Sequence, residues 1–84
     1  MTSSYFKAQM GMTNIKEAVY TLLKDNVPKG LRNVDIGKNL GIYGGHKGHE
    51  GHISRTILEI MQQEGVIEQR QDKLWYLCEN PSRN

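Results

Sequence analysis

The sequence predicts a small α+β domain that is mainly helical, with three helices followed by a C-terminal two-stranded β-hairpin. Apolar residues recur at helical spacing in two separate segments, near residues 14–26 and 52–64. Two short runs of strand-favouring residues, with a polar turn between them, follow the second segment. The chain has 84 residues, which is enough for one domain with a thin core.

The first helix is expected at residues 14–26. Asn14 and Glu17 have the spacing of a capping box, and Thr13 is an alternative cap. Pro28 and Gly30 end the helical pattern. Five apolar residues share one helix face: Ile15, Ala18, Val19, Leu22 and Leu23.

A short second helix is expected at residues 34–40, with Asn33 as its N-cap and Gly41 as its stop. Gly37 inside this helix costs up to about 1 kcal/mol relative to Ala, so the helix needs tertiary support. Leu31 lies in a short extended link before it. The apolar residues of the helix are Val34, Ile36 and Leu40.

Residues 41–52, GIYGGHKGHEGH, have the composition of a flexible loop, with five of the nine glycines and all three histidines. The spacing of His46, His49 and His52 matches neither a zinc finger nor the metalloprotease helix motif, so we expect no metal. Lys47 is followed by Gly48 where a phosphate-binding loop needs Ser or Thr. We expect no other cofactor and, since no nucleophile–base pattern is evident, no enzymatic activity.

The third helix is expected to begin near His52 and to end at Gly65. Its apolar stripe consists of Ile53, Ile57, Ile60 and Met61, with Leu58 beside it. Strands at 66–70 and 74–78 then form the hairpin, with Trp75 and Leu77 facing the core and Tyr76 facing outward.

We expect one domain over residues 13–78, between a flexible N-terminal segment at 1–12 and a flexible tail at 79–84. Tyr5, Phe6 and Met10 of the first segment can still dock on the core. Twelve residues are expected to share that core: Ile15, Val19, Leu22, Leu23, Ile36, Leu40, Ile53, Ile57, Met61, Ile67, Trp75 and Leu77.

The order of these elements and several short motifs resemble the winged helix-turn-helix family over residues 13–78. The matching motifs are Ser54-Arg55-Thr56 early in the third helix, Glu64-Gly65-Val66-Ile67 at its end, and Trp75-Tyr76-Leu77 in the return strand. Segment 34–42 resembles the first helix of the helix-turn-helix, with Gly37 at a position where a small residue packs. The segment between the two helices is longer than the family's usual turn.

The resemblance implies a DNA-binding module whose third helix enters the major groove and whose hairpin, the wing, contacts the backbone. Arg55 can bind guanine or phosphate, and polar groups near the start of that helix can reach base edges. Glycine amides and a helix N-terminus suit phosphate. The candidate contacts with double-stranded DNA are Lys47, His49, His52, Ser54, Arg55, Thr56, Arg70 and Lys73.

Other readings stay open. Glu59 and Glu64 oppose phosphate, and Arg55 can pair with Glu59 along the helix instead of binding DNA. A net charge of +2 also permits a winged-helix protein docking module without nucleic-acid binding, or an RNA-binding module. If the chain binds DNA, we expect it to act as a small transcriptional regulator or as the DNA-recognition domain of a larger protein. A second copy of the chain, in a homodimer, is a further expected partner.

The cellular setting is expected to be cytoplasmic. A single cysteine, Cys78, excludes an internal disulfide and fits a reducing compartment. The first twelve residues lack the basic start and apolar stretch of a secretory signal. We expect no membrane partner, because no apolar run is long enough to span a bilayer.

Overall fold

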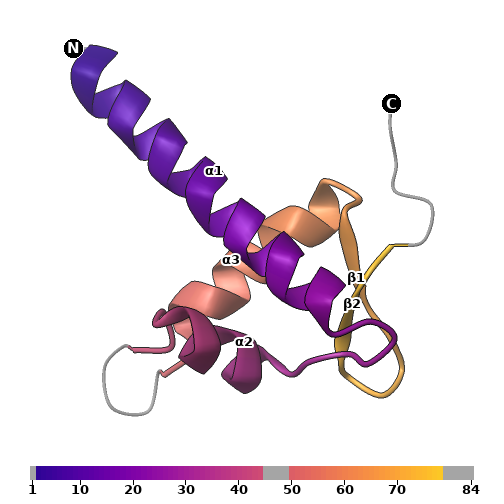
Figure 1. Ribbon diagram of the computed structural model, residues 1–84. Helices are drawn as coiled ribbons and strands as arrows, with labels where there is room; N and C mark the ends of the chain where they lie inside the picture. The colour runs from indigo at the N-terminus through magenta and orange to yellow at the C-terminus, as the bar shows by residue number, and fades with distance from the viewer. Residues whose placement is uncertain (1, 45–49, 79–84) are drawn as a thin grey trace.

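The computed structural model describes residues 2–44 and 50–78 and shows an α+β domain that is mainly helical (Figure 1). Within these residues, three helices precede a two-stranded antiparallel sheet. The elements are α1 (Thr2–Asp25), α2 (Asn33–Leu40), α3 (His52–Gln63), β1 (Ile67–Gln69) and β2 (Trp75–Leu77). None of the helices in this part of the chain is both long and apolar enough to cross a membrane.

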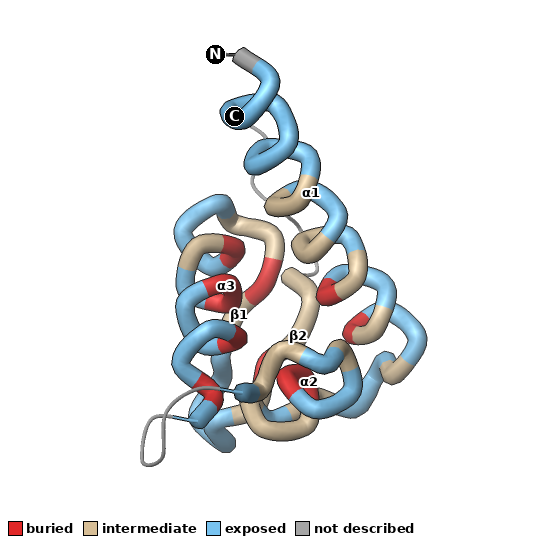
Figure 2. The backbone as a smooth tube through the Cα atoms, turned by 90° about the vertical axis from the view of Figure 1, so that its left-hand side faces the viewer, coloured by how far each residue is buried: buried red, intermediate tan, exposed pale blue. Residues whose placement is uncertain are grey.

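Helix α1 begins at Thr2, so residues 2–12, which were expected to form a flexible segment, are helical. The capping box expected at Asn14 therefore lies inside a continuous helix. Residues 3–10 are all exposed, and this half of α1 projects beyond the rest of the domain (Figures 1 and 2). Helix formation propagates cheaply from a turn that is already formed, which explains the extension from the packed half of α1. Residue 1 and the expected tail at 79–84 lie outside the described residues.

The core lies where the second half of α1 meets α2, α3 and the hairpin (Figure 2). Four expected members, Ile15, Leu22, Leu40 and Leu77, are only partly buried at its edge. Ile53 was placed wrongly, because it is 51% exposed, whereas Leu58, expected beside the stripe, is fully buried. The buried residues are Val19, Leu23, Ile36, Ile57, Leu58, Met61, Ile67 and Trp75.

Helix α2 starts one residue earlier than expected, with Arg32 instead of Asn33 as its N-cap. The Asp35 carboxylate accepts hydrogen bonds from the Arg32 backbone at 3.3 Å and from its guanidinium at 3.1 Å. This pairing lowers the pKa of Asp35. The expected stop at Gly41 is confirmed, since Gly41 adopts the left-handed conformation with φ of 73°.

The hairpin pairs Ile67 with Leu77 and Gln69 with Trp75. Leu31, in the link between α1 and α2, forms a bridge to Trp75 on the other edge of β2, with hydrogen bonds of 2.8 and 3.1 Å. This link comes so close to the sheet that a Cβ at Gly30 would lie 2.5 Å from a ring carbon of Tyr76. Tyr76 therefore packs over Gly30 and is half-buried instead of facing outward.

Candidate nucleic-acid interface

Close contact between α2 and α3 fixes the position of α3 and determines which of its faces is exposed. A Cβ at Gly37 would lie 2.9 Å from Ser54 Oγ and 2.9 Å from a ring carbon of Tyr43. Only a residue without a side chain allows the two helices to approach this closely. The expected packing role of Gly37 is thus confirmed.

Ser54 belongs to the packing between these helices and not to the outer surface. It is 1% exposed, and its Oγ lies 2.8 Å from Asn33 Oδ1 and 3.1 Å from the Gly51 carbonyl oxygen. The Asn33 amide nitrogen also donates to the Gly51 carbonyl at 3.2 Å. The interpretation of Ser54 as a contact to phosphate or base is therefore corrected: its hydroxyl is buried and bonded within the protein.

Gly51 forms the start of α3 at a point where no other residue fits. Its φ is 84°, and a Cβ there would lie 2.7 Å from a ring carbon of Tyr43. Its backbone N–H donates to the Tyr43 carbonyl at 2.7 Å, which ties together the chain on either side of residues 44–50. Lys47 and His49 belong to residues 45–49, which lie outside the described residues.

Three of the expected contacts lie exposed at the N-terminal end of α3: His52, Arg55 and Thr56. The Thr56 hydroxyl donates to the His52 carbonyl at 2.9 Å, which leaves its oxygen lone pairs available. Among residues 2–44 and 50–78, the Arg55 guanidinium has no hydrogen-bond or ion-pair partner. The alternative pairing of Arg55 with Glu59 is therefore not formed. Glu59 is exposed as well.

The first turn of α3 has no side-chain cap within the described residues. Its N-cap, Gly51, has no side chain to accept the backbone N–H groups that begin the helix, and the turn contains no acidic residue. These N–H groups and the helix dipole favour negative charge.

The two cationic residues of the hairpin differ in their availability. Arg70 Nε donates to Glu68 at 2.8 Å, and the guanidinium carbon lies 3.9 Å from the centre of the Tyr76 ring. Lys73 is exposed in the turn, and its ammonium group has no ion pair with any residue that the structure describes. Of the two cationic side chains, Lys73 is therefore the more available for a contact outside the protein.

The hairpin turn is held by the carboxylate of Asp72. It accepts from the Leu74 backbone N–H at 2.9 Å and from the Tyr76 hydroxyl at 2.6 Å. The Tyr76 hydrogen bond is the main reason that the pKa of Asp72 is lowered, and the same bond raises the pKa of Tyr76. The turn therefore presents Lys73 from a defined backbone, with φ of 71° at Lys73 itself.

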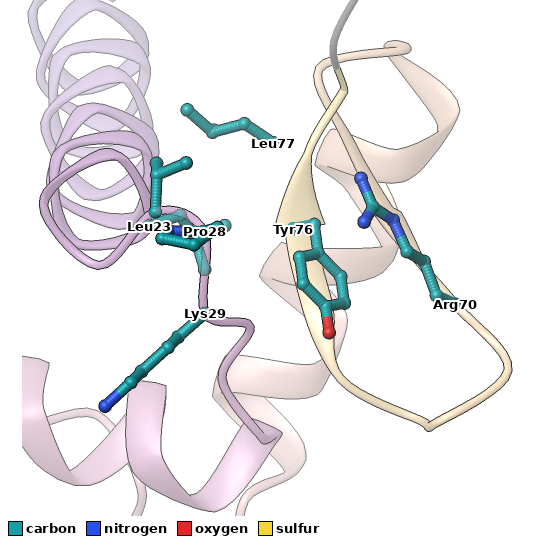
Figure 3. A pocket seen from close by; sticks show the side chains of 7 residues that line it. Leu23, Pro28, Lys29, Arg70, Tyr76 and Leu77 are labelled. Atoms are coloured by element: carbon teal, nitrogen blue, oxygen red, sulfur yellow. The ribbon is translucent and has the colours of Figure 1, made fainter.

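A small pocket of about 110 Å³ lies between the end of α1 and the hairpin (Figure 3). Pro28 and Lys29 line one side, and Tyr76 and Arg70 line the other. Its volume is well below the roughly 300 Å³ at which pockets begin to enclose a drug-sized ligand. We therefore assign no small-molecule site to it.

No three His, Cys, Asp or Glu side chains of the described ranges 2–44 and 50–78 form a group that could hold a metal ion. His46 and His49 fall outside these ranges, so the expectation that the histidines hold no metal stays a prediction. Cys78 is half-buried, and burial raises the pKa of its thiol, which disfavours the reactive thiolate.

Comparison with protein-family models, curated proteins and solved structures found no match to this chain.

Proposed function

We propose that this chain is a winged helix-turn-helix module that binds double-stranded DNA. In this proposal α2 and α3 form the helix-turn-helix, and β1 and β2 form the wing. One observation carries it: the start of α3 is braced from behind by Gly37 and Ser54, while Arg55 and Thr56 project outward without a charged partner in the described chain. A rigid helix with free polar groups at its N-terminal end suits the major groove.

Each remaining candidate contact has a role in this proposal. Arg55 bonds guanine or phosphate, and His52 and Thr56 bond phosphate or a base edge. The first-turn N–H groups of α3 bind a backbone phosphate, and Lys47 and His49 are further proposed contacts with the DNA backbone. Lys73 contacts the backbone from the wing, and Arg70 does so only by giving up part of its bonding to Glu68.

The charge balance predicts weak binding by a single copy. Glu59 on α3 and Asp72 beside Lys73 both repel phosphate, and the net charge of the chain is only +2. Few cations then neutralise phosphate, so binding falls with salt and gains from a second copy. Such a module would act in the cytoplasm as a small transcriptional regulator or as the recognition part of a larger protein.

The test is an NMR titration with random-sequence duplex DNA at two salt concentrations. Amide signals at the start of α3 and in the hairpin turn should move, and the shifts should weaken at high salt. Arg55→Ala should weaken binding by about 1–3 kcal/mol. Lys7→Ala removes an equal charge from the protruding half of α1 and serves as the control, with little effect expected.

The docking alternative has one observation in its favour: Ile53 is 51% exposed on α3. An exposed apolar side chain on α3 suits contact with a protein better than contact with phosphate. Absence of duplex binding at low salt, or equal losses for the Arg55 and Lys7 variants, would favour this alternative. Stronger competition by RNA than by duplex DNA would redirect the proposal to RNA.

A further inference from the structure

The protruding half of α1, residues 2–11, presents large apolar side chains to solvent. Tyr5 is 70% exposed, Phe6 is 62% exposed and Met10 is 49% exposed. A helical segment of this length is marginal in water by itself, and Gly11 weakens it further. Grouped apolar side chains on a surface are typical of an interaction site.

Phe6 and Met10 continue into an exposed stripe along α1. Its members are separated by four, three, four and three residues, so they share one helix face: Phe6, Met10, Thr13, Glu17 and Tyr20. Two shallow grooves follow the stripe and meet at Thr13. The first lies along the protruding half of α1, and the second continues between α1 and the end of α3, where Met61, Glu64 and Val66 form its other side.

The charge of this surface narrows the choice of partner. Between Ser3 and Asn14, Lys7 is the only charged residue. Within this stretch nucleic acid or an acidic protein would find a single cation, and a basic protein would find no carboxylate. Lys16, Glu17 and Glu64 line only the second groove. A surface of the same uncharged and apolar kind is the matching partner, and a second copy of the chain supplies it.

We propose that two copies of this chain form a dimer in which their α1 helices pack antiparallel about a twofold axis at Thr13. Phe6 of each copy then lies opposite Tyr20 of the other, which makes two aromatic pairs. Gln9 lies opposite Glu17, so the amide donates to the carboxylate. The protruding half of one α1 fills the groove beside α3 of the other copy.

Antiparallel packing is favoured over parallel packing by the charges on the stripe. Parallel helices in register would place Glu17 against Glu17, and like charges in contact oppose association. The antiparallel arrangement separates the two carboxylates and gives each an amide partner. Thr13 is small enough to let the helix axes approach to the usual 8–10 Å or so at the twofold axis.

The size of the surface predicts a dimer of moderate strength. Phe6, Met10 and Tyr20, which is 41% exposed, together offer roughly 300 Å² per copy. A standard interface buries about 800 Å² per partner, so the groove walls must supply the remainder. We expect dissociation in the micromolar range. This proposal is independent of DNA binding, because the surface is separate from Arg55 and the hairpin turn.

The experiment measures the oligomeric state of the full chain without DNA. Sedimentation equilibrium from low micromolar to near-millimolar concentration should show the mass rising from that of one copy to that of two. Phe6→Glu should weaken dimerisation at least about tenfold, since it buries a charge twice at the interface. Ser4→Glu adds the same charge on the opposite side of the same helical turn and should leave the dimer intact. Circular dichroism checks that both variants keep their helices.

Cross-linking tests the geometry separately. In a Cys78→Ser background, Thr13→Cys should form a disulfide between copies under mild oxidation, because the twofold axis brings the two residues together. Ser4→Cys should not do so. A chain that stays monomeric at every concentration, equal effects of the two glutamate variants, or cross-linking through Ser4→Cys alone would each overturn the proposal.

Discussion

The two halves of α1 belong to one continuous helix but have opposite surroundings. In the packed half, residues 12–25, Val19 is fully buried and Leu23 is 2% exposed. In the protruding half, Tyr5 and Phe6 are 70% and 62% exposed although they are larger. Burial therefore follows from what lies opposite each turn, not from how apolar the turn is. Lys16, in the packed half, has its ammonium group 2.7 Å from Glu64 at the end of α3.

The strongest test of this comparison truncates one large side chain in each half. Leu23→Ala leaves a cavity in the core and should reduce the free energy of unfolding by about 2–5 kcal/mol, enough to unfold much of so small a domain. Phe6→Ala removes contacts only with solvent and should change monomer stability by less than about 0.5 kcal/mol. Thermal or urea unfolding at low protein concentration measures both. Similar losses would mean that the halves do not differ in packing.

Gly37 provides the next largest effect, because a tightly packed helix position allows no added methyl group. Gly37→Ala should destabilise the domain by about 1–3 kcal/mol through overpacking against Ser54 and Tyr43. The same change raises helix propensity, which acts in the opposite direction. A net loss of stability would therefore mean that the overpacking between α2 and α3 outweighs the gain in propensity. Urea unfolding checks the value, and an unchanged midpoint would show that the helices can separate at no cost.

Gly11 is the matched position in the protruding half, and its substitution should have the opposite sign. A Cβ at Gly11 would meet nothing within 4 Å. Gly11→Ala should therefore stabilise α1 by about 0.5–1 kcal/mol through helix propensity alone. Amide hydrogen exchange over residues 2–11 should slow correspondingly. Faster exchange in this variant would contradict the open surroundings of Gly11.

The hairpin turn is as exposed as the protruding half of α1, but side-chain hydrogen bonds hold it in place. The Tyr76 hydroxyl lowers the pKa of Asp72, so Tyr76→Phe should raise that pKa toward its ordinary value. A lowered folded-state pKa means that the contribution of Asp72 to stability is present above its unfolded pKa and is lost as the pH falls through the folded one. An NMR titration of the Asp72 carboxyl in both proteins measures the shift. Equal pKa values would show that this hydrogen bond has no electrostatic effect on Asp72.

Local patterns predicted the kind and order of the elements correctly. The second half of α1, the helices α2 and α3, and the two strands coincide with the segments whose apolar spacing and stop signals predict them. Gly41 and Gly65 end their helices in the left-handed conformation because it costs glycine little. These features depend on neighbours within a few residues, which is why the sequence was sufficient.

The candidate site was predicted less well, since two of its described residues turned out to be engaged within the protein. Ser54 has the residue type of a phosphate ligand, but the phase of α3 turns it toward Asn33. Arg70 has the charge of a backbone contact, but Glu68 and Tyr76 occupy its guanidinium. Asn33 is predicted as a helix cap. Only the folded structure shows that its side chain contacts Gly51 and Ser54 and so joins α2 to α3. No local signal distinguishes these roles.

The sequence by itself determined that this chain forms three helices and a hairpin, because helix and strand preferences are set by side-chain periodicity and by Gly and Pro. Tertiary structure decided which side of α3 faces inward. Ile53 and Leu58 are similarly apolar, and packing against the rest of the core buries Leu58 alone. Tertiary structure also decided that α1 extends to Thr2, because the packed half provides a nucleus from which each further turn forms at little entropic cost.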